Sequence, residues 1–160
     1  YDIVTAAGVI QWINRESFLK NLRNIIKEQG YVLIYDFSVS DKMRDSKTYS
    51  DWWHNAYLKE FPKPFRNESV WSADDVNCCQ FSMLDQVQYE MEYQFDRESF
   101  IKFMMIQSNV NAKIEGEGRS IEDVRKWFEQ SLAAIFDTER KTVIFTGYSW
   151  YMKALYIDGN

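Results

Sequence analysis

The chain has 160 residues, which is the size of one ordinary domain and allows roughly 70% of the unfolded chain's surface to be buried. The net charge is −5 and the lysines and arginines are scattered, so the basic stripe typical of nucleic-acid binders is missing. No apolar run approaches the roughly eighteen residues of a membrane span and no signal peptide is recognisable, so we expect a cytoplasmic protein that binds neither nucleic acid nor membranes.

Aromatic residues make up 17% of the chain, which predicts a core built from large rings or a pocket lined with them. The two cysteines, Cys78 and Cys79, are neighbours in the sequence. Adjacent cysteines rarely form a disulfide, and two thiols without a nearby histidine make a poor metal site. We therefore expect free thiols and no bound metal.

The first forty residues predict a β-α-β unit. Residues 1–6 are rich in β-branched residues and indicate a short buried strand. A helix is expected from the N-cap Asn14 to about residue 28, with Gly30 as its C-terminal cap. Residues 31–36 form an almost unbroken apolar run, so we expect a second strand parallel to the first. The helix face turned inward would consist of Phe18, Leu19, Leu22, Ile25 and Ile26.

Residues 40–84 are less regular and indicate a helical insert. Within them, residues 46–61 predict a helix that Pro62 ends. One side of this helix is aromatic and apolar, with Tyr49, Trp52, Trp53, Ala56, Tyr57 and Phe61. Ser72, which two acidic residues follow, predicts the start of another short helix.

The last part of the chain predicts two strands separated by two helices. Residues 86–95 alternate between apolar and polar side chains, as a half-exposed strand does. Helices are expected over residues 97–108, capped by Asp96, and from Ser120 to residue 136. A long final strand over residues 142–156 can run antiparallel to its neighbours. The pattern therefore indicates an open α/β sheet.

Residues 1–12 (YDIVTAAGVIQW) resemble the fourth strand and following loop of class I S-adenosylmethionine-dependent methyltransferases. The similarity is greatest to the trans-aconitate methyltransferase-like group, which acts on small molecules. In that group an acidic residue opens the strand, and a Gln-Trp or His-Trp pair closes the loop, here Gln11 and Trp12. Residues 19–30 and 31–37 are similar to the next helix and strand, although Glu28-Gln29-Gly30 departs from the family's usual ending.

The resemblance implies that residues 1–160 form a single domain, the C-terminal half of a Rossmann-like methyltransferase. Its strands would correspond to the family's fourth to seventh, in the spatial order 4-5-7-6 with the last one antiparallel. The family's glycine-rich turn and its ribose-binding acidic residue have no counterpart here. We therefore expect a fragment that is inactive alone.

Gly116-Glu117-Gly118-Arg119 precedes a predicted helix, as a nucleotide-binding turn would. No buried strand comes before it, and Glu117 would repel a phosphate group. We interpret this segment as a plain loop.

The resemblance also implies that Ala6, Ala7, Gln11 and Trp12 border the cofactor S-adenosylmethionine. Ligands of open α/β sheets bind beyond the carboxyl ends of the strands, and the small residues there allow a close approach to the backbone. Trp12 would cover the apolar part of the ligand or, alternatively, would pack as a core ring on the following helix.

The substrate-binding residues would be Asp36, Tyr49, Trp52 and Trp53. Asp36 would orient the methyl acceptor or cap a turn. The three aromatic residues would be walls of an acceptor pocket, the hydrophobic side of a lid, or both. His54, the only histidine, is a weak candidate for a general base and otherwise an ordinary surface or packing residue.

The function expected in the complete protein is methyl transfer to a small molecule, with carboxylates among the candidate acceptors. The alternative is a protein-interaction module that keeps a degenerate methyltransferase half-fold and binds a partner through its aromatic helix. The open edge of the first strand predicts self-association, as a dimer, around residues 1–12.

Overall fold

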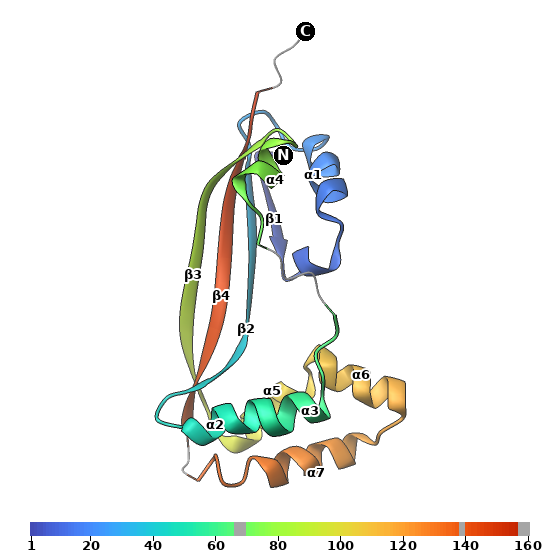
Figure 1. Ribbon diagram of the computed structural model, residues 1–160, viewed down its shortest axis with the longest axis vertical. Coiled ribbons are helices and arrows are strands. Elements are labelled where there is room, and N and C mark those ends of the chain that lie inside the picture. The colour runs from blue at the N-terminus through green and yellow to red at the C-terminus, as the bar shows by residue number, and fades with distance from the viewer. Residues whose placement is uncertain (66–69, 138–139, 157–160) are drawn as a thin grey trace. The chain divides into compact units, whose positions relative to one another are not determined.

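The computed structural model describes residues 1–65, 70–137 and 140–156, and these residues divide into two compact units (Figure 1). Unit 1 comprises Tyr1–Ser38, Arg66–Glu90 and Thr146–Asn160, and unit 2 comprises Val39–Phe65 and Met91–Phe145. The predicted insert of residues 40–84 is therefore shared between the two units.

A four-stranded sheet has the order β1-β2-β4-β3. Its strands are β1 (Ile3–Ala7), β2 (Tyr31–Met43), β3 (Phe81–Phe95) and β4 (Lys141–Ala154). β1 is parallel to β2, with Ala7 opposite Tyr35. β4 runs the other way in Figure 1, and the Ala154 N–H donates to the Gly30 carbonyl at 2.8 Å. The predicted strand order is therefore confirmed: the last strand, β4, is antiparallel to β2 and lies between β2 and β3.

In unit 1, α1 (Arg15–Arg23) lies beside β1 (Figure 1). Its predicted N-cap is confirmed, because Asn14 Oδ1 accepts from the Ser17 N–H at 2.9 Å. The predicted C-terminus is wrong, because the helix stops at Arg23. Ile25, expected to face inward, is consequently 52% exposed. Gly30 does not cap the helix: an added Cβ would lie 2.8 Å from the Ile26 side chain, so glycine is required there by close packing.

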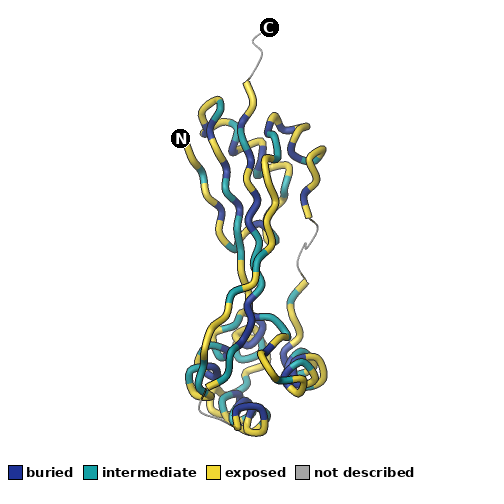
Figure 2. Tube along the Cα trace, turned by 90° about the vertical axis from the view of Figure 1, so that its left-hand side faces the viewer, coloured by how far each residue is buried: buried dark blue, intermediate teal, exposed yellow. Residues whose placement is uncertain are grey.

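The short helix predicted after Ser72 is α4 (Ala73–Asn77). Ser72 and Asp75 form a complete capping box, in which each side chain accepts from the other residue's backbone N–H. The core of unit 1 consists of Ala6, Ile10, Leu19, Leu22, Ile26, Val32, Ile34, Trp71, Val76, Cys79, Phe81, Trp150, Met152 and Ala154. Buried positions alternate with more exposed ones along parts of the strands of the sheet (Figure 2).

Unit 2 contains most of the helices. They are α2 (Lys47–Trp52), the π-helical turn η2 (Trp53–Tyr57), α3 (Leu58–Glu60), α5 (Arg97–Met105), α6 (Ser108–Glu117) and α7 (Ile121–Ser131). α2, η2 and α3 follow one another without a break, and the Ser46 side chain caps the first of them. The aromatic helix predicted over residues 46–61 is therefore confirmed.

Two boundaries predicted in unit 2 are wrong. The expected helix over 97–108 ends at Met105, and the expected helix from Ser120 to residue 136 ends at Ser131. A separate helix, α6, includes Gly116 and Glu117, which were expected in a loop, and Gly118 closes it in the left-handed conformation. Its weak amphipathic pattern, with the polar Asn109 buried, explains why the sequence did not reveal it.

Two of the strands, β2 and β3, are longer than predicted. β2 continues past residue 36 to Met43, and β3 begins at Phe81 instead of residue 86. Both extensions carry buried residues, Val39 and Met43 in unit 2 and Phe81 in unit 1. Packing with residues distant in the sequence therefore sets these ends, and local patterning does not.

Candidate functional site

The parallel pairing of β1 with β2 ends in unit 1, at the carboxyl end of β1. Ala7, the last residue of β1, is opposite Tyr35, and the N–H of the following Gly8 donates to the Tyr35 carbonyl at 2.9 Å. Asp36 is the next residue on β2. Because ligands of open α/β sheets bind beyond such ends, this edge is the candidate site.

The side chains of Gln11 and Asp36 meet at this edge. Gln11 lies on the 3-10 turn η1 (Ile10–Trp12) and donates from Nε2 to Asp36 Oδ2 at 3.0 Å. The same amide donates to the Gly8 carbonyl at 3.3 Å, and the Phe37 N–H donates to Asp36 Oδ1 at 2.8 Å. The turn after β1 is therefore tied to the middle of β2 through one carboxylate.

Gly8 allows this close approach. Its φ is +63°, in the left-handed region that favours glycine, and an added Cβ would lie 3.3 Å from Asp36 Oδ1. A larger residue would strain the backbone and crowd the carboxylate.

Two tyrosines lie near Asp36: an added Cβ at Gly147 would meet both the Tyr89 ring and the Asp36 carbonyl, and the Asp36 charge acts on Tyr148. The Tyr89 hydroxyl donates to the Tyr148 carbonyl at 3.5 Å. The Tyr89 ring lies so close to Gly147 that an added Cβ there would come within 2.4 Å of it. Burial, with the nearby Asp36 charge and Tyr89 as smaller causes, raises the pKa of Tyr148 to about 12, so its hydroxyl stays protonated at neutral pH. We call Gln11, Asp36, Tyr89 and Tyr148 the polar edge.

Of the residues predicted to border the cofactor, Gln11 belongs to the polar edge, and the others lie on β1 and η1. Ala6 is buried and Ala7 is exposed. Gln11 contacts Asp36, which the sequence analysis placed among the residues that bind the methyl acceptor. The ring of Trp12 is not in the core, because the residue is 52% exposed. The sequence did not identify Tyr89 and Tyr148 as site residues, because only strand pairing brings them to Asp36.

The aromatic residues predicted to bind the acceptor lie in the core of unit 2. Tyr49, Trp52 and Trp53 are 0%, 7% and 4% exposed. The ring centroids of Tyr49 and Trp52 are 5.6 Å apart, and those of Trp52 and Tyr57 are 5.4 Å apart. They form the hydrophobic side of the helix. Trp52 Nε1 is buried and has no hydrogen-bond partner among the described residues.

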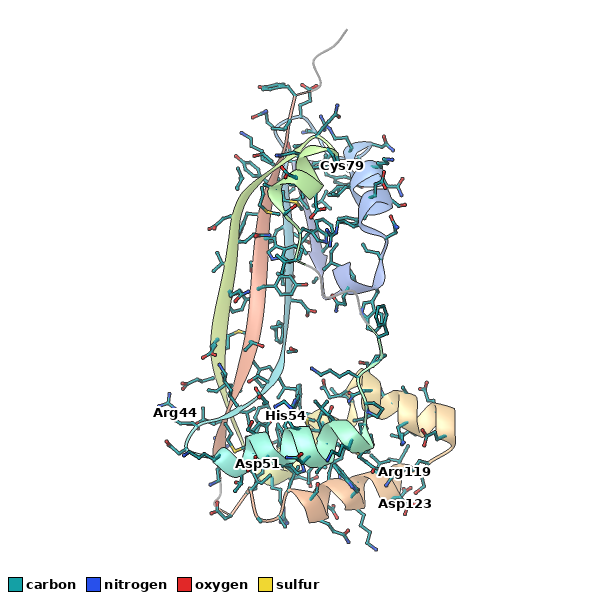
Figure 3. The ribbon with its side chains drawn as sticks, in the orientation of Figure 1. Arg44, Asp51, His54, Cys79, Arg119 and Asp123 are labelled. Carbon is teal, nitrogen blue, oxygen red and sulfur yellow. The ribbon has the colours of Figure 1, made fainter. Side chains whose placement is uncertain are left out.

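His54 lies on the same helical segment, in η2 (Figure 3). Its Nε2 is 2.9 Å from Asp41 Oδ2, and the Ser50 hydroxyl donates to that oxygen at 3.5 Å. The hydrogen bond with His54 lowers the pKa of Asp41 below its ordinary value. Both side chains are partly open to solvent, so this pair is a surface ion pair when His54 is protonated.

Other kinds of site have less support. Cys78 and Cys79 are free thiols, with their sulfur atoms 3.7 Å apart at the end of α4. Within the part of the chain that the structure describes, no group of three or more His, Cys, Asp or Glu side chains could hold a metal ion. No described helix is both long enough and apolar enough to span a bilayer.

No family model and no curated protein matches the sequence. Among solved structures, the fold is similar to that of a candidate type II methyltransferase from Anaeromyxobacter dehalogenans, with a TM-score of 0.61 and 16% identity over 96% of this chain and 63% of that protein. A candidate methyltransferase from Bacillus halodurans gives a TM-score of 0.47 and 13% identity over 98% of this chain and 65% of that protein.

The first likeness establishes the fold. The chain is a mixed α/β protein whose open sheet matches the Rossmann-like sheet of methyltransferases, as the sequence predicted. It spans less than two thirds of the length of either protein.

Proposed function

We propose that this chain takes part in S-adenosylmethionine-dependent methyl transfer to a small molecule. The observation that carries the proposal is the polar edge, where Gln11 and Asp36 meet at the carboxyl end of β1, just past its pairing with the parallel β2, in a methyltransferase-like sheet. We also propose that the chain is the C-terminal part of a longer methyltransferase and is inactive alone. The sheet order and the partial coverage of the similar structures support this.

The residues at the edge are suited to a bound cofactor. Glycine at position 8 keeps the backbone open beside Asp36, and the Oε1 atom of Gln11 is buried without a partner among the described residues. A buried acceptor of this kind costs free energy unless a ligand or water satisfies it. Ala6, Ala7, Gln11 and Trp12 would then border the cofactor, and Asp36 would face the acceptor.

Methyl transfer requires alignment more than acid–base chemistry. When bound, S-adenosylmethionine supplies an electrophilic methyl group on a sulfonium. The chain's own residues would position the acceptor in line and limit access of water, and such positioning can contribute about 7–11 kcal/mol. The protonated Tyr148 hydroxyl can donate a hydrogen bond to the acceptor, and the Asp36 carboxylate can accept one.

Isothermal titration with S-adenosylhomocysteine tests the proposal. The 160-residue chain and a version extended at its N-terminus by the remainder of the sheet would be titrated side by side. We expect binding by the extended protein, with affinity lowered at least tenfold by Gln11→Ala and unchanged by Asn55→Ala, an exposed residue of unit 2. Absence of binding by both versions would contradict the methyltransferase proposal.

The alternative function, a protein-interaction module, receives no support from its expected contact surface. That surface was the aromatic helix, whose rings are buried in unit 2. We therefore retain only the methyltransferase proposal.

A further inference from the structure

The side-chain atoms of Gln11 and Asp36 that keep hydrogen-bonding capacity are acceptors. Gln11 directs its only donor group, Nε2, to Asp36 and to the Gly8 carbonyl, which leaves Oε1 buried and unsatisfied. The reverse orientation would place the amide oxygen against the Asp36 carboxylate, where two acceptors would repel each other. The side-chain orientation is therefore determined by Asp36, and the remaining oxygen requires a donor.

The Asp36 carboxylate has only neutral hydrogen-bond partners in the part of the chain that the structure describes. There its two oxygen atoms accept from the Gln11 amide and the Phe37 N–H. Within residues 1–65, 70–137 and 140–156, no lysine, arginine or histidine pairs with it. A partly buried carboxylate without a cation is an unfavourable arrangement that a bound cation would relieve.

The neighbouring rings also favour a cation. Tyr148 is near enough to Asp36 for the carboxylate charge to act on it, and it remains a neutral phenol at physiological pH. Trp12, directly after Gln11, exposes about half of its surface. Aromatic faces attract ammonium groups, and a negative ligand such as a carboxylate would meet the Asp36 charge.

We propose that the polar edge binds an ammonium group, through the Asp36 carboxylate and the free Oε1 of Gln11. This specifies a ligand for the same site and rests on the proposed function for its biological meaning. The ammonium group has two sources in a methyl-transfer reaction: the amino-acid part of the cofactor, or an amine that accepts the methyl group. In either case carboxylates are disfavoured beside Asp36.

The test is an NMR titration of the ¹⁵N-labelled chain with methylammonium chloride and, separately, with sodium acetate at equal ionic strength. The probe is the side-chain amide signal of Gln11, identified by its absence in Gln11→Leu. We expect methylammonium to shift this signal in a saturable manner and acetate to leave it unchanged. Asp36→Asn, which keeps the shape of the side chain, should weaken the response at least tenfold.

Asp51→Asn is the matched control, because it removes an exposed carboxylate from α2 in unit 2 (Figure 3). It should leave the response unchanged. A shift of equal size with acetate, or no saturable shift with methylammonium, would overturn the proposal. Both results are measured on the unsubstituted chain, and Gln11→Leu serves only to assign the signal.

Two further ligands identify the source of the ammonium group. If Asp36→Asn weakens binding of S-adenosylhomocysteine but not of methylthioadenosine, which lacks the amino-acid part, the group belongs to the cofactor. If it weakens neither, the group belongs to the acceptor. Failure of S-adenosylhomocysteine to bind even the extended protein would contradict the proposed function, whereas the methylammonium result would still decide the ammonium site.

Discussion

Gly8 and Gly116 show that glycines of one sequence have different physical roles. Gly8 adopts a positive φ beside Asp36, whereas Gly116 lies in α6 and has no heavy atom within 4 Å of an added Cβ. Substitution by alanine should therefore have opposite effects at the two positions. The left-handed conformation costs an alanine roughly 1–2 kcal/mol, whereas alanine in a helix is favoured over glycine by roughly 0.5–1 kcal/mol.

We predict that Gly8→Ala lowers the free energy of unfolding by about 1–2 kcal/mol, or more if Asp36 cannot move away. Gly116→Ala should leave it unchanged or raise it by up to about 1 kcal/mol. Urea denaturation followed by circular dichroism measures both. Equal effects of the two substitutions would contradict this account of Gly8.

His54 and Asp41 provide a prediction about pH. The hydrogen bond with His54 lowers the pKa of Asp41, so the stability that Asp41 contributes is present above its unfolded pKa and is lost as pH falls through the folded value. We predict that His54→Ala raises the pKa of Asp41 toward its ordinary value, about 3.9. NMR titration of the Asp41 carboxyl carbon measures this.

The control is Asn55→Ala, which alters the next exposed residue of η2 and should leave the Asp41 pKa unchanged. An unchanged pKa in His54→Ala would show that the contact with His54 does not persist in solution.

The segment α2-η2-α3 is the element on which the core of unit 2 depends. Its side chains pack ring against ring with those of α5 and α7. Phe61, at the end of the segment, is fully buried and stacks on Phe128 with centroids 5.3 Å apart. The Phe61 carbonyl also accepts a hydrogen bond of 2.7 Å from Nδ2 of the buried Asn109. Oδ1 of the same asparagine accepts from the Tyr57 hydroxyl at 3.0 Å. Apolar packing and a satisfied polar pair thus hold the same residues.

We predict that Phe61→Ala lowers the free energy of unfolding by about 3–5 kcal/mol, the range for a large aromatic residue removed from a core. Phe65 supplies a matched control, because it is 95% exposed and its replacement by alanine should change stability by less than about 0.5 kcal/mol. Chemical denaturation measures both variants. A loss below about 1 kcal/mol in Phe61→Ala would contradict the proposed core.

At the scale of the whole molecule, the sheet is open at β1. This strand comes first in the order β1-β2-β4-β3 and pairs only with β2 among the described residues. Ile3 on this strand is 63% exposed. An apolar edge strand with unpaired backbone groups is a template for pairing with another strand.

We propose that the isolated chain self-associates through β1 and predict a concentration-dependent dimer in sedimentation velocity experiments. Ile3→Lys should shift the equilibrium toward the monomer, because charge on an edge strand opposes pairing. Ile106→Lys, which alters a similarly exposed isoleucine of unit 2, should have no effect. A monomer at all concentrations would contradict the proposal.

The sequence by itself determined most of the elements and their order. Local signals were sufficient where they were strong: the N-caps Asn14, Ser72 and Asp96, the aromatic face of residues 46–61, and the apolar run at residues 31–36. The resemblance supplied the sheet order, which periodicity alone does not contain. Local signals failed at element ends and at α6, where burial by distant residues outweighs propensity.

The tertiary structure alone decided which residues share the candidate site. Gln11 and Asp36 were both candidates from the sequence, but their hydrogen bond arises only when β1 and β2 pair in parallel. The Asp36 charge acts on Tyr148 because β4 lies next to β2, a pairing of segments more than one hundred residues apart. Conversely, Trp52 and Trp53 were assigned to the core of unit 2 by packing that no local pattern could distinguish from a pocket wall. The periodicity of apolar residues in the sequence indicates which side of a helix or strand is apolar, but the residues that this side contacts depend on the tertiary structure.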